Sequence, residues 1–507
     1  MKKKLSHIDV EDIYKKIKQD AIMSANNSDD ITRTLYKIEY VAKFAYTMNF
    51  IYRDDDMEML LSKTVSQLRI EEFISSPVRN RYVLIDTDGS DNHGLTQQYI
   101  RALISCNYEF LFIHVSDCYR HLSDTLSEIN NYNKGSVFLF KKSGLSYVDK
   151  IKGIVKSIKE YSPSCMLLHL MPWDVITLGA CCCLNGIKKI NINLTDHAYW
   201  MGASFIDYNI EFRSFGYTIS LEKRGLKKEQ LLFLPYYPIF PIRQISFKGF
   251  PELSTDCVKI FSGGSFYKMF GRNGYYFYLI DSVLEMNPKA VFLLAGSGNR
   301  FVLNKYLSKL RNRDRIFLIG NRKDINEVFK RCDVYMATYP ITGGLMSQYA
   351  AVHGKPILAY TSEKEPYNII EGLIGHNEKL DCTCFEYKQF IEYACKLCSD
   401  ATFRIHEGEV LKRAIITKEE FDLEFKVLMN GGMTNRIFHK MDIDYETMRE
   451  LYLDVEKIQC EGVLGLAKNY NISILKFVKI EKLITPLFVL MNNKINRLLK
   501  RCHLFYI

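Results

Sequence analysis

Residues 332–360 read CDVYMATYPITGGLMSQYAAVHGKPILAY, and this stretch decides the fold class. Its pattern predicts a strand over residues 333–338, a loop with Gly343 and Gly344, a helix over 345–353 and a second strand over 356–360. The glycine pair therefore lies where a strand passes into the N-terminus of a helix. The first amides of a helix have no partner within it, and the helix dipole favours an anion there. The stretch predicts an α/β protein that binds a phosphate, as in a nucleotide or a nucleotide-sugar.

Short apolar strands alternate with helical segments on both sides of this stretch. One series has apolar runs at residues 82–86, 110–115, 136–140, 165–170 and 189–193, and a second has them at 258–264, 290–298, 315–320, 333–338 and 356–360. Residues 234–241 (LPYYPIFP) form the best linker between the two series, because three prolines in eight residues interrupt helices and central strands. The pattern predicts two doubly wound, Rossmann-like α/β domains with ligand at the carboxyl ends of the strands.

Helical patterns flank the two α/β series. We expect a helical leader over residues 1–76, an acceptor domain over 77–238, a nucleotide-sugar domain over 239–400 and a helical region over 401–507. Residues 473–501 combine an apolar stripe with many lysines and arginines. This tail either packs on the domains or binds an anionic membrane surface from the side.

Composition restricts the class of protein. The chain has 507 residues, which is too long for one ordinary core, and its 47% hydrophobic and 25% charged residues are typical of globular proteins. The net charge of +10 serves either solubility or attraction to anionic ligands or membranes. The start lacks the apolar core of a signal peptide, and no window reaches about 20 uninterrupted apolar residues. We therefore expect a cytoplasmic protein, either free or at the inner face of the membrane, and no nucleic-acid partner.

The fourteen cysteines are not a disulfide framework in a chain of this length. Cys181, Cys182 and Cys183 are adjacent in an apolar run, which is typical of buried thiols in a reducing compartment. No CxxC pair is repeated, so we expect no structural zinc and no metal site.

Two motifs indicate other functions. Residues 295–299 (AGSGN) begin like a dinucleotide fingerprint, but Phe301 stands where the third glycine belongs, so NAD binding has little support. Residues 86–91 (DTDGSD) resemble the first motif of haloacid-dehalogenase-type phosphatases, with Asp86 as the nucleophile and Asp88 as the acid/base. That hypothesis needs a later acidic pair for magnesium, and none ends the following apolar runs. The same D-x-D occurs in single-domain glycosyltransferases, which have a different architecture.

Basic and histidine side chains complete the candidate site. Lys268, in FSGGSFYK at residues 261–268, follows the first strand of the second series and can neutralise a diphosphate. His93 and His197 follow strands of the first series, where a histidine can accept a proton from a hydroxyl group. His353 precedes Gly354 at the end of a helix, where we expect a structural residue whose positive charge suits the dipole.

These residues carry a resemblance to a known family. From about residue 80 to 400 the chain resembles the GT-B glycosyltransferases, and it is similar to their O-GlcNAc transferase and bacterial protein N-glucosyltransferase group. Tyr267 and Lys268 match the family's Tyr-Lys pair at the diphosphate, and residues 338–356 match its strand–loop–helix that ends in G-x-P. Residues 197–213 resemble its glycine-containing loop with an Asp-Tyr pair. At the family's acidic ribose-binding position this chain has Tyr349, beside Gln348.

The resemblance implies a metal-independent enzyme that transfers a hexosyl or N-acetylhexosaminyl group from a nucleotide-diphosphate sugar, most simply a UDP-sugar. The acceptor is expected to be a saccharide, a lipid-linked saccharide or a protein, in surface polysaccharide or glycoprotein assembly. A glycosyltransferase-like partner subunit without activity is an alternative, as is the phosphatase. The implied base is His93, with His197 as second choice. The implied donor site consists of Gly263, Gly264, Tyr267, Lys268, Gly296, Asn321, Thr342, Gly343, Gly344, Gln348 and Tyr349.

Overall fold

The computed structural model describes residues 5–87, 89–92, 94–116, 121–140, 144–193, 195–241, 245–483 and 486. The chain divides into two compact units that each gather distant segments. Unit 1 is Met1–Ile13, Gln244–Ile415 and Asp442–Ile507, and unit 2 is Tyr14–Arg243 and Ile416–Met441. The segment 14–76, most of the expected leader, thus belongs to unit 2, and the expected C-terminal region is shared between the units.

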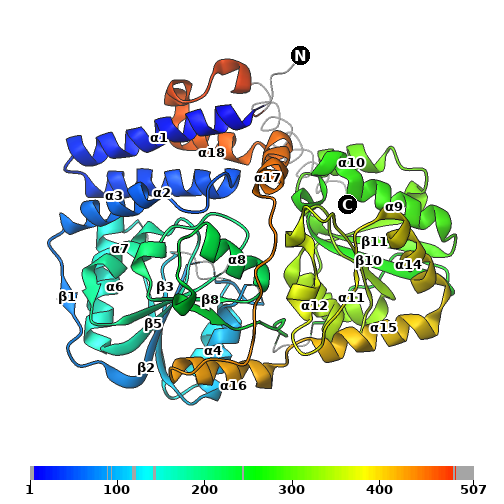
Figure 1. The fold of residues 1–507 in the computed structure, drawn as a ribbon, viewed down its shortest axis with the longest axis horizontal. Helices are drawn as coiled ribbons and strands as arrows, with labels where there is room; N and C mark the ends of the chain where they lie inside the picture. Colours follow the sequence, from blue (N-terminus) through cyan, green and yellow to red (C-terminus); the bar gives the residue numbers. More distant parts are fainter. Residues whose placement is uncertain are drawn as a thin grey trace, which may run out of the picture. The chain divides into compact units, whose positions relative to one another are not determined.

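Unit 2 is built on a seven-stranded, fully parallel sheet with the strand order β4-β3-β2-β5-β7-β8-β9 (Figure 1). Its strands are β2 (Val78–Asp86), β3 (Glu109–His114), β4 (Gly135–Leu139), β5 (Pro163–His169), β7 (Lys188–Ile192), β8 (Tyr208–Glu211) and β9 (Leu231–Phe233). Its helices are α4 (Thr96–Ser105), α5 (Ser123–Asn130), α6 (Tyr147–Tyr161), α7 (Val175–Cys183), α8 (Ser214–Glu222) and α16 (Lys418–Met429). The short strands β1 (Glu72–Phe73) and β6 (Leu184–Asn185) pair with each other and form a separate two-stranded sheet.

The leader consists of α1 (His7–Asn27), α2 (Ile31–Met48) and α3 (Asp55–Ser66). Aspartates begin α2 and α3: Asp30 accepts a hydrogen bond from the amide of Arg33, and Asp54 accepts one from the amide of Met57. Glu58 on α3 is buried and accepts three amides from the loop 202–204 of the same unit. The leader therefore supports a loop at the edge of this sheet.

Unit 1 is built on a six-stranded parallel sheet with the order β12-β11-β10-β13-β14-β15. Its strands are β10 (Val258–Ser265), β11 (Ala290–Ser297), β12 (Ile316–Gly320), β13 (Val334–Met336), β14 (Ile357–Tyr360) and β15 (Thr383–Cys384). Its helices are α9 (Tyr275–Met286), α10 (Arg300–Leu307), α11 (Ile325–Arg331), α12 (Gly344–Val352), α13 (Glu371–Ile374), α14 (Tyr387–Ser399), α15 (Ala401–Ala414), α17 (Tyr445–Gln459) and α18 (Glu461–Tyr470).

Side chains of β10 alternate between two buried faces, as expected for a central parallel strand. Ile260 lies in the core formed with α9 and α14, whereas Phe261 contacts Phe329 of α11 with ring centroids 5.3 Å apart. Helices therefore cover both faces of the sheet (Figure 1). The predicted fold class, two doubly wound α/β parts with flanking helices, is confirmed.

The diagnostic stretch folds nearly as its pattern predicts. The strand β13 is shorter than predicted because the chain turns at Thr338, whose hydroxyl donates to the carbonyl of Ile341 over 2.7 Å. The helix α12 begins at Gly344 and ends at Val352, and β14 follows. Residues 234–241 form no helix or strand, as the prolines predict.

Within the described residues, no helix is long and apolar enough to cross a membrane. Of the basic tail, only residues 473–483 and 486 are described, and there Lys482 pairs with Asp9 over 2.8 Å. The other tail residues to 501 lie outside the described part.

Candidate functional site

The carboxyl ends of the parallel strands of unit 1 meet at one edge of the sheet. Strands β10 and β11 pair in register, with Gly264 opposite Gly296. Asn321 directly follows β12 and is exposed. The loop 338–343 follows β13, so four segments converge on this edge.

Glycine is required where β10 and β11 end. A Cβ on Gly296 would stand 1.9 Å from the carbonyl oxygen of Gly264, and the φ of Gly296 is +139°. The corresponding Cβ position on Gly264 has no atom nearer than 4.0 Å. A Cβ on Gly263 would lie 3.1 Å from the terminal methyl group of Met346, and its other near contacts come from β10 and β11. The backbone of β10 is thus open to a ligand at Gly264.

The N-terminus of α12 lies at this edge. Gly343 is the N-cap residue, and no side chain that the structure describes caps the helix. The amides of Gly344, Leu345 and Met346 donate no hydrogen bond to any residue that the structure describes. With the positive end of the helix dipole, they form an anion-binding position.

Lys268 lies between these two features. Its Nζ is 3.8 Å from the Cβ position of Gly343, and its Cδ is 4.0 Å from that of Gly264. Within the described part of the chain, its ammonium group forms no ion pair or hydrogen bond. Desolvation by burial lowers the pKa of Lys268. A bound anion would supply the missing counter-charge and favour the protonated lysine.

Asn368 holds the loop that carries these groups. This fully buried side chain accepts the amide of Thr342 at 3.0 Å and donates to the carbonyl of Pro340 at 2.8 Å. The Thr342 hydroxyl is itself used, because it donates to the carbonyl of Thr338 at 3.2 Å. Thr342 therefore shapes the loop, and Asn368 is a site residue that sequence reasoning missed.

Asn368→Ala is expected to destabilise unit 1 by about 1–3 kcal/mol, because it leaves buried loop groups without partners. It should also weaken binding of UDP, since the loop 340–343 loses its anchor. Isothermal calorimetry and thermal unfolding measure the two effects. Asn287→Ala is the control: Asn287 is also buried in unit 1 and donates to the carbonyl of Val283, so this variant should lose stability and keep its affinity. Equal UDP affinity in both variants would contradict the role of Asn368.

The side chains of two expected donor residues, Gln348 and Tyr349, contact neighbouring elements of unit 1. The side chain of Gln348 is buried and donates to the carbonyl of Leu373 at 3.1 Å. The ring of Tyr349 is buried and stacks on Phe329 at 6.3 Å. Tyr267 is 40% exposed. The structure thus brings together at this edge Gly263, Gly264, Lys268, Gly296, Asn321, Thr342, Gly343 and Gly344.

The prediction of a positive charge on His353 is wrong. Burial, reinforced by Lys330 and Lys355, lowers the pKa of His353 to about 4. The ring stacks on Phe329 at 6.0 Å, so this histidine is neutral and serves packing.

Unit 2 presents a histidine supported by a buried ion pair. His93 lies outside the described residues. The Nδ1 of His197 is 3.3 Å from Oδ1 of Asp196, and the guanidinium of Arg213 binds Asp196 through Nε and Nη2. Burial tends to raise the pKa of Asp196, but Arg213 and His197 outweigh it and lower the pKa. Asp196 therefore stays ionised and fixes the orientation of the His197 ring.

The loop that carries this histidine is rigidly held. The fully buried Arg224 donates from Nη2 to the carbonyls of Thr195, Asp196 and Ala198. Asp196, Arg213 and Arg224 were missed from sequence. The sequence signal for Asp196 was its place directly before His197 in the order T-D-H of residues 195–197. Arg213 and Arg224 flank α8, far from His197 in the sequence, and had no such signal.

The phosphatase hypothesis finds no support. Asp86 is fully buried, its Oδ2 accepts the hydroxyl of Thr96, and its Oδ1 is 3.3 Å from Nδ1 of His169. These partners engage both oxygens of the buried carboxylate, which disfavours its attack on a phosphate. The residues described include no cluster of three potential metal ligands, and Asp88 lies outside them.

Solved structures of similar fold are glycosyltransferases. The chain is similar to a mutant O-GlcNAc transferase of Thermobaculum terrenum, with a TM-score of 0.50 and 12% identity over 86% of this chain and 83% of that one. It is also similar to a glycosyltransferase of Rickettsia africae, with a TM-score of 0.51 and 12% identity over 71% of this chain and 100% of that one. No protein-family model and no curated protein matches the sequence. The likenesses confirm the GT-B glycosyltransferase fold.

Proposed function

We propose that the protein transfers a sugar from a nucleoside-diphosphate sugar, preferentially a UDP-sugar, to a hydroxyl or amide acceptor. The observation that carries this proposal is that the ammonium of Lys268, next to the amides that begin α12, has no partner among the described residues, and neither do these amides. An unpaired, partly buried cation is unfavourable unless a ligand neutralises it. A diphosphate has the charge and the acceptor oxygens to satisfy both features.

In the proposed reaction the bond between the anomeric carbon and the diphosphate oxygen breaks, and the diphosphate leaves with the electron pair. Lys268 and the amides of Gly344, Leu345 and Met346 stabilise its growing negative charge. The acceptor atom bonds to the anomeric carbon and gives its proton to a base. His197, oriented by Asp196, suits this role, and His93 is the other candidate.

The likeness of fold to an O-GlcNAc transferase supports a hexosyl or N-acetylhexosaminyl group. The acceptor is proposed to be a saccharide, a lipid-linked saccharide or a protein, in surface polysaccharide or glycoprotein assembly. Contact of the C-terminal tail with the inner face of the membrane remains part of this proposal.

A nucleotide screen tests the donor site. UDP at about 100 times its Kd should stabilise the protein by about 2.7 kcal/mol, read as a rise in Tm, and GDP and CDP should do so less. Absence of stabilisation by every nucleotide diphosphate would refute the donor site. UDP binding without turnover of any UDP-sugar would instead indicate the inactive partner subunit.

Chelation tests the chemistry. Because Lys268 and backbone amides supply the positive charge, EDTA is expected to leave hydrolysis of the UDP-sugar unchanged. Loss of activity with EDTA and its return with magnesium would contradict metal-independent transfer.

A further inference from the structure

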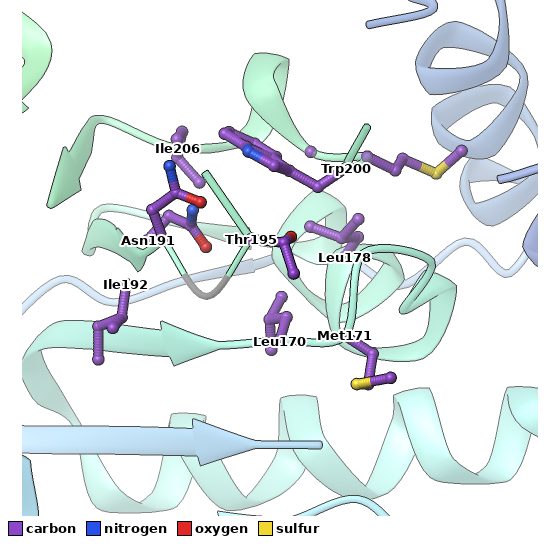
Figure 2. Close-up of a pocket in the computed structure, with 11 residues that line it drawn as sticks. Leu170, Met171, Leu178, Asn191, Ile192, Thr195, Trp200 and Ile206 are labelled. Carbon is purple, nitrogen blue, oxygen red and sulfur yellow. The ribbon is translucent and has the colours of Figure 1, made fainter. Parts of the chain in front are cut away.

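The loop that carries His197 is closely packed within unit 2. We call residues 195–206, between β7 and β8, the His197 loop. Thr195, Trp200 and Ile206 of this loop line a recess that has room for about one water molecule (Figure 2). Because the loop has little space in which to move there, the groups that hold its backbone decide where His197 lies.

Asn49 of the helical leader holds the backbone at His197 itself. Its Nδ2 donates to the carbonyl oxygen of His197 at 3.0 Å, and its Oδ1 accepts the amide of Tyr199 at 3.0 Å. Asn49 is only 1% exposed, so water does not compete for these bonds. The two consecutive peptide groups that follow the Cα of His197 are therefore both fixed by one side chain.

The helix end at Asn49 does not by itself require an asparagine side chain. Asn49 is the C-cap residue of α2, with a φ of +44°, and its amide donates to the carbonyl of Ala45 at 2.8 Å. Glycine adopts this left-handed conformation at least as easily. A buried amide side chain is unfavourable unless both of its polar groups have partners. The His197 loop supplies both partners, and this contact explains the asparagine.

Neighbouring leader residues hold the rest of the loop. The buried Glu58 accepts three consecutive backbone amides near the end of the loop. Arg53 donates from Nη2 to the hydroxyl of Ser204 at 3.2 Å and from Nη1 to the carbonyl of Arg224 at 2.6 Å. Arg224 in turn donates to three carbonyls at the start of the loop. The leader segment 49–58 thus contacts the loop at both of its ends.

This leader segment is anchored in its turn. The carboxylate of Asp54 accepts the amide of Met57 and so begins α3. It also accepts the hydroxyl of Tyr14 at 2.6 Å and the ammonium of Lys18 at 2.8 Å, both from α1 and both within unit 2. A support of this kind keeps a side chain in place before any substrate arrives.

We propose that Asn49 is a positioning residue for His197, and that the leader segment 49–58 holds the His197 loop in its working geometry. Asp196 orients the His197 ring through Nδ1, and Asn49 fixes the backbone from which the ring projects. The Nε2 of His197 is then left at one place to receive the proton of the acceptor. This inference rests on the proposed sugar transfer with His197 as its base.

Asn49→Gly tests the role, because glycine removes the side chain and keeps the left-handed φ without strain. The probe is release of UDP from UDP-glucose or UDP-N-acetylglucosamine, with water as the acceptor. We expect kcat to fall about 10–100-fold, since a small misplacement of a reacting group has effects of this size. Hydrogen exchange of the Tyr199 amide should become faster, because this amide loses its acceptor. UDP affinity, measured by calorimetry, should be unchanged.

Asn107→Gly is the matched control. Asn107 belongs to unit 2, has a φ of +59°, and accepts Nζ of Lys134 with its side-chain oxygen at 2.9 Å. This variant should keep both kcat and the slow exchange at Tyr199. Asn49→Asp serves if Asn49→Gly does not fold: it keeps an oxygen for the Tyr199 amide and loses the N–H that binds the His197 carbonyl, so its kcat should fall as well.

A double variant separates positioning from a general loss of structure. Added to His197→Gln, Asn49→Gly should lower kcat no further, because a residue that acts through His197 has no effect once that side chain is gone. A further loss as large as in the natural chain, or an unchanged kcat in folded Asn49→Gly, would overturn the inference and leave sugar transfer standing. If the natural protein turns over neither donor, the proposed function fails, and the inference fails with it.

Discussion

Lys268→Ala is expected to lower turnover of the UDP-sugar by about 100–1000-fold, the usual effect of removing one group that stabilises a leaving anion. The ammonium has no partner among the described residues, so its removal breaks no ion pair of the resting protein. The folded protein should be no less stable, because a desolvated cation is lost. Affinity for UDP should fall together with turnover. Steady-state kinetics, calorimetry and thermal unfolding measure the three quantities.

Lys259→Ala is the control, because Lys259 lies on β10, the strand that leads to Lys268. Lys259 is near the start of β10, at the opposite end from Lys268, and pairs with Asp333 over 3.8 Å. This variant should keep its turnover. Equal rates for Lys268→Ala and the natural enzyme would refute the assignment of the donor site.

The pH dependence of UDP binding provides a second check on the same group. Burial lowers the pKa of Lys268, so its ammonium is lost at lower pH than that of an ordinary lysine. Bound diphosphate favours the ammonium and raises this pKa, so binding should take up a proton on the alkaline side. UDP affinity in the natural protein should therefore decline as pH rises, and the decline should be absent in Lys268→Ala.

Local pattern was sufficient to place Gly264, Lys268 and Gly343 at one edge of the sheet. Gly264 ends β10, whereas Lys268 and Gly343 lie in segments that follow strands, and a parallel sheet brings the carboxyl ends of its strands together. Asn368 could not be found in this way, because it lies 25 residues beyond the loop that it holds and its role depends on tertiary contact.

Gln348 and Tyr349 were expected at the ligand because the resemblance places a ribose-binding residue at that position of the helix α12. The helix reads GLMSQYAAV and is buried on most sides, so its apolar periodicity does not reveal which face meets α13 and which meets α11. In the structure, the side chain of Gln348 donates a hydrogen bond to the carbonyl of Leu373 in α13, and the ring of Tyr349 stacks on Phe329 of α11. Only packing decides between the faces of such a helix.

Domain membership of the C-terminal region also depends on tertiary contact. Sequence indicates helix over residues 418–429 but not the sheet on which it packs. In unit 2, Phe421 and Phe425 of α16 lie at 5.4 Å and 5.7 Å from the Tyr99 ring of α4. Such edge-on aromatic pairs join segments more than 300 residues apart, so the local hydrophobic periodicity of either segment cannot predict them.

His197→Gln is expected to lower sugar transfer by about 100–10,000-fold if His197 is the base, because glutamine accepts no proton. Affinity for UDP should stay the same, since the residues that support diphosphate binding belong to unit 1. His406→Gln is the control: His406 is an exposed histidine whose Nδ1 is also 3.3 Å from a carboxylate, that of Glu407, and its loss should change nothing.

His93→Gln, made in parallel, separates the two candidate bases. Asp196 is kept ionised by Arg213, so it can hold the proton-bearing Nδ1 of His197 and leave Nε2 as the atom that receives the acceptor's proton. Sugar transfer should then be lost in His197→Gln and kept in His93→Gln. Full transfer by His197→Gln with loss in His93→Gln would instead assign the base to His93, and the Asp196–Arg213 pair would be left with the structural task of fixing the loop 195–198.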